Sequence, residues 1–150
     1  MSELTIIHHA VNPSSEEKRA VKLLASRGAL AKRRWRGIAE DGREFGFDLD
    51  HPISHGHPFL INGDTIYVVE QERESILCIP TANLEQASRI GWSLGNLHFP
   101  VHVQPEAIHV LDDPAVVQML QRENIPYTRM NCVFMPRLAD SHHQHEHHHV

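Results

Sequence analysis

The side chains best suited to chemistry in this sequence are imidazoles, and they gather at its C-terminal end. Six of the 14 histidines lie in the last nine residues: His142, His143, His145, His147, His148 and His149. Neutral imidazole is a common ligand of nickel, zinc and copper, and a run of histidines offers ligand pairs at many spacings. The tail therefore predicts binding of borderline divalent metal ions. The alternative is an expression tag, but Gln144 and Glu146 interrupt the histidines.

A second candidate ligand is His98, in the run Gly95-Asn96-Leu97-His98. Apolar residues at helical spacing predict a helix over 83–94, and Gly95-Asn96 is suited to a left-handed exit from it. His98 then precedes a short strand. A histidine near a helix end can equally be structural, because the negative helix C-terminus favours a protonated imidazole. The residues alone leave both interpretations open.

The remaining histidines and the cysteines give weaker signals. His102 and His109 fall on neighbouring predicted strands and are possible auxiliary ligands. The cluster of His51, His55 and His57 could bind a metal, although a solvent-exposed loop is the simpler interpretation. Cys78 and Cys132 lie in apolar runs without CxxC spacing, which predicts two buried thiols.

Composition and motifs exclude several classes of function. The chain lacks HExxH, a nucleophile with a recognisable partner and a glycine-rich phosphate loop, so we expect no enzyme and no metal-dependent hydrolase. Its net charge of -5 argues against binding to nucleic acid. No apolar run approaches the roughly 18 residues of a membrane span, and the N-terminus does not resemble a signal peptide. We therefore expect a cytoplasmic protein without a membrane partner.

The first half of the chain is expected to form short strands joined by turns. Asp41-Gly42 between two alternating segments is typical of a β-hairpin, and Asn62-Gly63 marks another turn. Strands are predicted at 4–7, 33–39, 44–49 and 65–69. The segment 12–24 is polar and then amphipathic, and it could hold a turn of helix. The basic cluster at 32–36 is interpreted as a solvated strand face rather than an anion-binding surface, because acidic residues follow.

The periodicity of the apolar residues changes after the charged segment 70–75, where we place a domain boundary. The pattern beyond it predicts six elements in order. They are a strand over 75–80, the helix over 83–94, strands near 100–104 and 107–110, a helix capped at Asp112-Asp113-Pro114, and a strand over 131–135. This β-α-β-β-α-β order is that of a ferredoxin-like unit. The predicted class is α+β, with a β domain at 1–72, a ferredoxin-like domain at 73–138 and a disordered histidine-rich tail at 139–150.

Several of these features together resemble one family. Gly95-Asn96-Leu97-His98 followed by Pro100 is similar to the Gly-Asn-Arg-His motif of the urease accessory protein UreE family, the nickel metallochaperones of urease maturation. The run 41–49 resembles the family's Asp-Gly-Arg-Glu hairpin, and Gly63-Asp64 before an apolar strand matches its Gly-Asp turn. The helix at 111–120 and the histidine-rich tail also fit. Leu97 departs from the pattern, because the family has arginine there.

The resemblance implies a fold, partners and a metal site. Its members form homodimers through the C-terminal domain, where the motif histidine of each subunit binds one shared ion; here that residue is His98. Tail histidines would complete the shell, with His145 and His147 favoured for their spacing. The implied cargo is Ni²⁺, with Zn²⁺ or Cu²⁺ possible in vitro, and the implied partners are the urease apoprotein and an accessory GTPase. The N-terminal domain could bind a partner or peptide. A nickel or zinc storage protein is the alternative.

Overall fold

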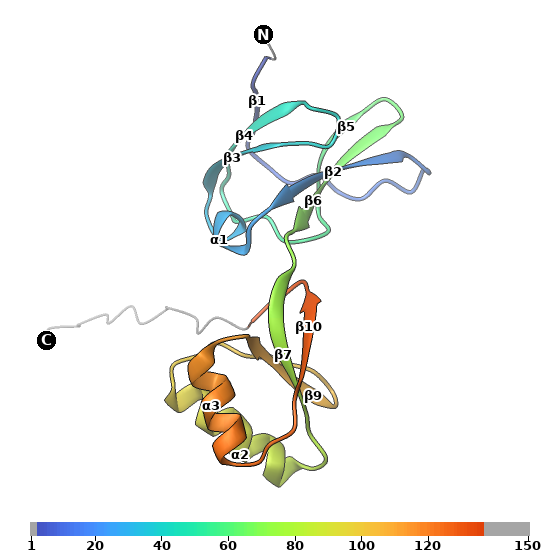
Figure 1. Ribbon diagram of the computed structural model, residues 1–150. Helices are drawn as coiled ribbons and strands as arrows, with labels where there is room; N and C mark the ends of the chain where they lie inside the picture. The colour runs from blue at the N-terminus through green and yellow to red at the C-terminus, as the bar shows by residue number, and fades with distance from the viewer. Residues whose placement is uncertain (1–2, 137–150) are drawn as a thin grey trace, which may run out of the picture. The chain divides into compact units, whose positions relative to one another are not determined.

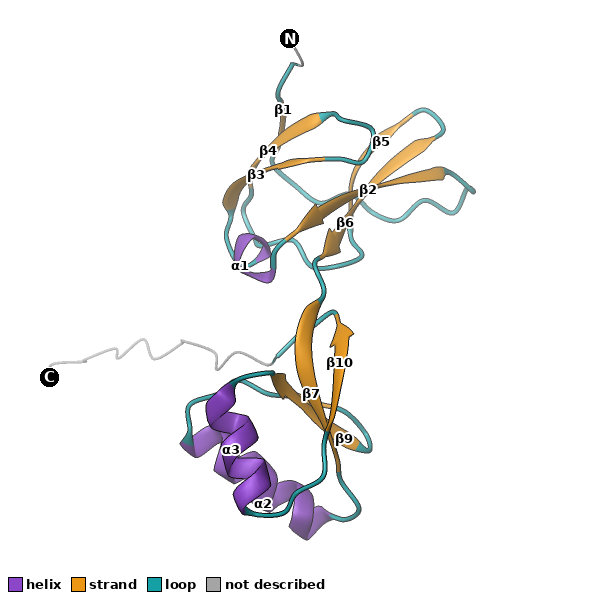
Figure 2. Cartoon of the chain, in the orientation of Figure 1, coloured by secondary structure: helices purple, strands orange, loops and turns teal. Residues whose placement is uncertain are grey.

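The computed structural model describes residues 3–136 of the chain. Its contacts divide the chain into two compact units between Arg73 and Glu74. The first unit is almost entirely strand, and the second combines strands with both long helices (Figures 1 and 2). The predicted α+β class is therefore confirmed. No helix in the described part of the chain is long and apolar enough to cross a membrane.

The first unit consists of two three-stranded sheets with strand orders β1-β4-β3 and β2-β6-β5. Its elements are β1 (Thr5–Ile7), β2 (Arg19–Ala25), α1 (Arg27–Leu30), β3 (Arg34–Ile38), β4 (Glu44–Asp48), β5 (Pro58–Asn62) and β6 (Thr65–Gln71). An isolated bridge between Leu23 and Ala39 joins the two sheets. Phe45 and Phe59 pack edge to face at 5.0 Å in the shared core. Such an aromatic contact stabilises a fold by about 1 kcal/mol beyond the contribution of burying the rings.

The two predicted turns of this unit are confirmed, but one predicted element is wrong. Gly42 and Gly63 adopt positive φ angles of 86° and 59°, which glycine reaches without steric cost. The segment 12–24, which could have held a turn of helix, contains none; from Arg19 onward it belongs to β2, which pairs in parallel with β6. Its buried residues alternate strictly at Val21, Leu23 and Ala25, which is the period of a strand. Strand β5 was not predicted from the sequence.

The first hairpin carries a hydrogen bond whose removal should be measurable. The Tyr67 hydroxyl donates to the Asp41 carboxylate at 2.7 Å, and this bond lowers the pKa of Asp41. The Tyr67→Phe variant should lose about 1 kcal/mol of stability at neutral pH. A carboxylate with a lowered folded pKa contributes stability above its unfolded pKa of about 3.9 and loses it as the pH falls through the folded value. Urea unfolding should therefore show the gap between variant and parent narrowing below about pH 4. A gap that widens on acidification would contradict this assignment.

The second unit is a four-stranded antiparallel sheet with two helices on one face (Figure 1). Its elements are β7 (Glu74–Pro80), α2 (Leu84–Asn96), β8 (His102–Val103), β9 (Ala107–Leu111), α3 (Pro114–Arg122) and β10 (Thr128–Cys132). The strand order is β10-β7-β9-β8, so β9 lies between the two strands that α2 connects. Side chains from β7, β9 and both helices form one apolar core.

The helix starts follow the sequence closely, whereas the last strand does not. Asn83 caps α2 by accepting from the Gln86 amide at 2.8 Å, and Asp113 caps α3 by accepting from Ala115 at 2.8 Å. The last strand, expected over 131–135, is β10 and begins three residues earlier. Its residues are almost all exposed, so its placement follows from pairing with β7 and not from its own apolar pattern.

Candidate functional site

His98 lies in the turn that ends α2 and has a left-handed backbone with a φ of 63°. The Phe99 amide donates to the Leu94 carbonyl at 3.1 Å, and the His98 amide donates to the Gly95 carbonyl at 3.0 Å. These two bonds define a Schellman motif, in which the left-handed position usually holds glycine. Histidine therefore occupies a position that costs a residue with a side chain about 1–2 kcal/mol.

The helix end differs from the prediction, which placed the left-handed exit at Gly95-Asn96. Both residues remain helical, and the chain turns two residues later. In a Schellman motif the residue after the left-handed one packs against the helix residue five positions before it. Here Leu94 is fully buried, and Phe99 packs against the same core. The packing of Leu94 and Phe99 in this core favours His98 as the left-handed residue. This preference comes from tertiary packing and cannot be read from residue types alone.

The imidazole of His98 is exposed, and its surroundings suit a cation. The last turn of α2 contains no basic side chain, so none of its own residues neutralises the negative end of the helix dipole. The adjacent Leu97, which stands where the family has arginine, is 39% exposed and adds no charge. The site therefore combines an exchangeable ligand with a partial negative charge.

The strain at His98 gives a prediction with an internal control. Replacing His98 by glycine should stabilise the metal-free chain by about 0.5–1 kcal/mol, because relief of the left-handed cost outweighs the greater unfolded-state entropy of glycine. Asn124 occupies the same position after α3, with a φ of 54°. Asparagine tolerates this conformation, so Asn124→Gly should have a smaller effect. Denaturation followed by helical circular dichroism compares the two; equal gains would show that the histidine carries no special strain.

A second group of ligand-type side chains lies on the sheet face opposite the helices. Ile108 and Val110 of β9 point into the helix-facing core, so His109 between them points the other way. His109 is paired in register with His102 on β8 and with Cys78 on β7. The prediction of two buried thiols is wrong, because Cys78 and Cys132 are both only half-buried. Cys78 points away from the core because its neighbours Leu77 and Ile79 occupy it.

The two imidazoles of this row are close neighbours. Their ring centroids lie 5.9 Å apart at an angle of 86°. The Gln104 amide nitrogen lies 3.1 Å from Nε2 of His102 and is placed to hold that ring. Burial of the ring, and secondarily the charge of His102, lower the pKa of His109, which favours its neutral, metal-binding form. Neither the pairing nor Gln104 could be recognised before the strand register was known.

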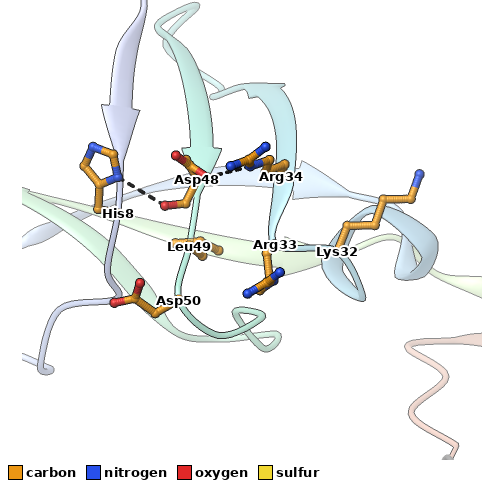
Figure 3. Close-up of a pocket in the computed structure, with 7 residues that line it drawn as sticks. All are labelled: His8, Lys32, Arg33, Arg34, Asp48, Leu49 and Asp50. Atoms are coloured by element: carbon orange, nitrogen blue, oxygen red, sulfur yellow. Dashed lines mark hydrogen bonds and ion pairs between the residues drawn. The ribbon is translucent and has the colours of Figure 1, made fainter.

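Two histidines of the first unit, His8 and His55, are held by local contacts. His55 accepts a hydrogen bond from the Gln71 amide at 2.9 Å, which gives one member of the predicted His51, His55 and His57 cluster a structural role. His8 donates to the Asp48 carbonyl at 3.1 Å in a pocket that also contains Arg33 and Arg34 (Figure 3). Arg34 pairs with the Asp48 carboxylate at 2.8 Å, so charges of both signs line this pocket.

The predicted ligands are therefore only partly brought together. Among residues 3–136, no group of three histidine, cysteine or acidic side chains is arranged to hold a metal ion. His98 is exposed on its own at the end of α2, and His102 and His109 form a pair. The tail ligands His142, His143, His145, His147, His148 and His149 lie outside the described residues.

Comparison with known proteins supplies the context for this arrangement. Residues 74–150 match the family described as UreE urease accessory protein, C-terminal domain. The urease accessory protein UreE of Staphylococcus carnosus (strain TM300) is 30% identical over 128 residues, covering 83% of this chain and 85% of the relative. The protein of the same name from Azorhizobium caulinodans is 29% identical over 80% of this chain, which spans 64% of that relative. The one from Streptococcus vestibularis is 29% identical, with 71% and 72% covered. The chain belongs to the UreE family of urease accessory proteins.

Proposed function

We propose that this protein is a nickel metallochaperone, which binds the ion and delivers it for assembly of the urease metallocentre. Family membership supports a role in urease maturation. The observation that carries the proposal is His98, an exposed imidazole in a strained left-handed position at an unneutralised helix end. Strain of this kind is retained where it serves a function, and cation binding is the function that imidazole there suits best.

The tightest site is formed by His98 from each of two copies of the chain. A single exposed imidazole does not bind a metal ion tightly. If a two-fold axis passes beside His98, the same residue from the second chain supplies a second imidazole. The neighbouring Leu97 is apolar and exposed, so it can be buried when the two helix ends meet. We therefore propose that the C-terminal domain both forms the dimer and binds the metal ion.

The tail completes this site and collects further ions. Two imidazoles leave coordination positions for other ligands, and the tail supplies six more imidazoles, with His145 and His147 as the favoured pair. Because a ligand outside a closed tetrahedral cage exchanges faster than one inside it, a shell completed by tail histidines suits transfer. The protein is proposed to act in the cytoplasm, without catalysing a reaction.

Delivery requires partners other than a second copy of the chain. We propose that the ion passes to the complex of urease apoprotein and its accessory GTPase. The first unit, with its own core and sheets, is the proposed partner-binding domain. The two units have separate cores, so one is proposed to contact the acceptor while the other holds the ion.

The test is activation of apo-urease by the nickel-loaded protein. The acceptor complex is incubated either with loaded protein or with a nickel buffer set to the same free-ion activity. A chaperone should activate urease faster than the buffer does, and the gain should depend on the accessory GTPase. Equal activation in both arms would reject delivery.

Storage is the second candidate, because so many imidazoles in one short tail also suit sequestration of excess ion. It uses the same ligands as delivery, so binding measurements cannot distinguish the two. The activation experiment does so, since a store gives no advantage over buffered nickel at equal free-ion activity.

A further inference from the structure

We propose that His102 and His109 form a second transition-metal site on the face of the C-terminal sheet opposite the helices, separate from His98. The pair spans β8 and β9, which are hydrogen-bonded neighbours in register at these two residues. Directly opposed residues on antiparallel strands have Cβ atoms about 4.5–5.5 Å apart, which is within reach of a shared ligand. The two side chains therefore lie next to each other on the same face of the sheet.

The separation of the rings is compatible with a shared ion. A metal–nitrogen bond of about 2.0–2.1 Å places each ring centre roughly 3 Å from the ion, so two rings sharing it lie at most about 6 Å apart. The observed separation between ring centroids is 5.9 Å. This separation is close to the upper limit, so the side chains have to rotate for their nitrogens to meet on one ion.

The surroundings give an ion access to the pair. The side-chain nitrogen of Gln104 lies 3.1 Å from Nε2 of His102 and is a donor, so an ion that binds this nitrogen displaces the contact. His102 also lines a hollow of about 510 Å³ together with Val103, Met135 and Pro136. Both histidines are partly exposed, so an ion can reach them from solvent and keep water in its remaining positions.

The ligand set indicates the class of ion. Two imidazoles without a carboxylate suit Ni²⁺, Cu²⁺ and Zn²⁺ rather than Mg²⁺ or Ca²⁺, which need oxygen ligands. Because no third histidine, cysteine or acidic side chain joins the pair in the described part of the chain, the site is open and exchangeable.

Zinc titration of the full-length chain tests the site residue by residue. The six tail histidines are replaced by alanine so that they do not compete, and the histidine rings are labelled with ¹⁵N for NMR. The resonances of His102 and His109 should shift together, at the same zinc concentration and with one ion per chain. Rings that respond at different zinc concentrations, or not at all once His98 has responded, would overturn the proposal without needing any further variant.

Substitutions add a second, independent readout. Either His102→Gln or His109→Gln should weaken the zinc response of the remaining partner by at least about 10-fold, while the response of His98 is unchanged. The matched control is His51→Gln, an exposed histidine of the first unit, which should leave both responses as they were. If His109 binds zinc equally well in the His102→Gln variant, the two imidazoles do not share an ion. Because His98 is followed in the same spectra, failure of this site is distinguishable from failure of the proposed chaperone site.

Discussion

Replacing His98 by alanine should weaken the tightest nickel site of this protein by at least about 100-fold. Loss of a neighbour that merely orients a metal ligand typically costs about 10–100-fold in affinity. Here one substitution removes the ligand itself, and in a symmetric pair it removes both copies at once. The histidines of the tail are not expected to restore a site of the same affinity. Competition with a chromophoric chelator measures this affinity directly.

The matched control for His98→Ala is Asn124→Ala. Asn124 holds the same left-handed position after α3 and makes the same pair of helix-ending hydrogen bonds. Its substitution disturbs a helix end to a similar extent but removes no imidazole, so nickel affinity should not change. A His98→Ala variant that keeps its affinity within about threefold would show that His98 is structural and that the metal site lies elsewhere.

Replacing the six tail histidines by alanine should have the largest effect on the number of ions bound. The tail carries nearly half of the histidines of the chain, and most weakly bound ions should be lost with it. The tight site should persist at one ion per two chains, weakened by about 10-fold at most, because water can occupy positions that the tail had filled. Equilibrium dialysis with elemental analysis measures the stoichiometry.

The control for the tail keeps all its histidines and changes the residues that interrupt them. A chain with Gln144→Ala and Glu146→Ala retains every imidazole of the tail and should bind as many ions as the parent. The tail variant should also deliver nickel to apo-urease more slowly, since an exchangeable ligand has been removed. Loss of all binding in the tail variant would reverse the roles assigned here to His98 and the tail.

Local signals in the sequence were sufficient for much of the fold. Asp41-Gly42 and Asn62-Gly63 predicted their turns because positive φ is cheap for glycine. Asn83 and Asp113 marked helix starts because their side chains satisfy free amides of the first turn. Strand β2 was missed although its buried residues alternate, because the polar stretch before it obscured where the period begins.

The candidate site depended on tertiary structure to a greater degree. By residue type, Gly95 and Asn96 are better suited than His98 to a left-handed backbone. The packing of Leu94 and Phe99 in the core nevertheless gives His98 this conformation. Likewise, His102 and His109 are seven residues apart, and only the register of β8 against β9 makes them neighbours. A one-residue shift would have put the two side chains on opposite faces of the sheet. Sequence patterns identify such residues as candidates, while packing and register decide which of them meet.

Native mass spectrometry of the full-length chain at limiting nickel counts ions and chains in the same species, and so tests whether two copies of His98 share one ion. We expect one nickel ion on a species of two chains. This species should disappear in the His98→Ala variant and persist in Asn124→Ala. Nickel on single chains of the parent, or an undiminished two-chain nickel species in His98→Ala, would contradict the assignment of His98 as the shared ligand.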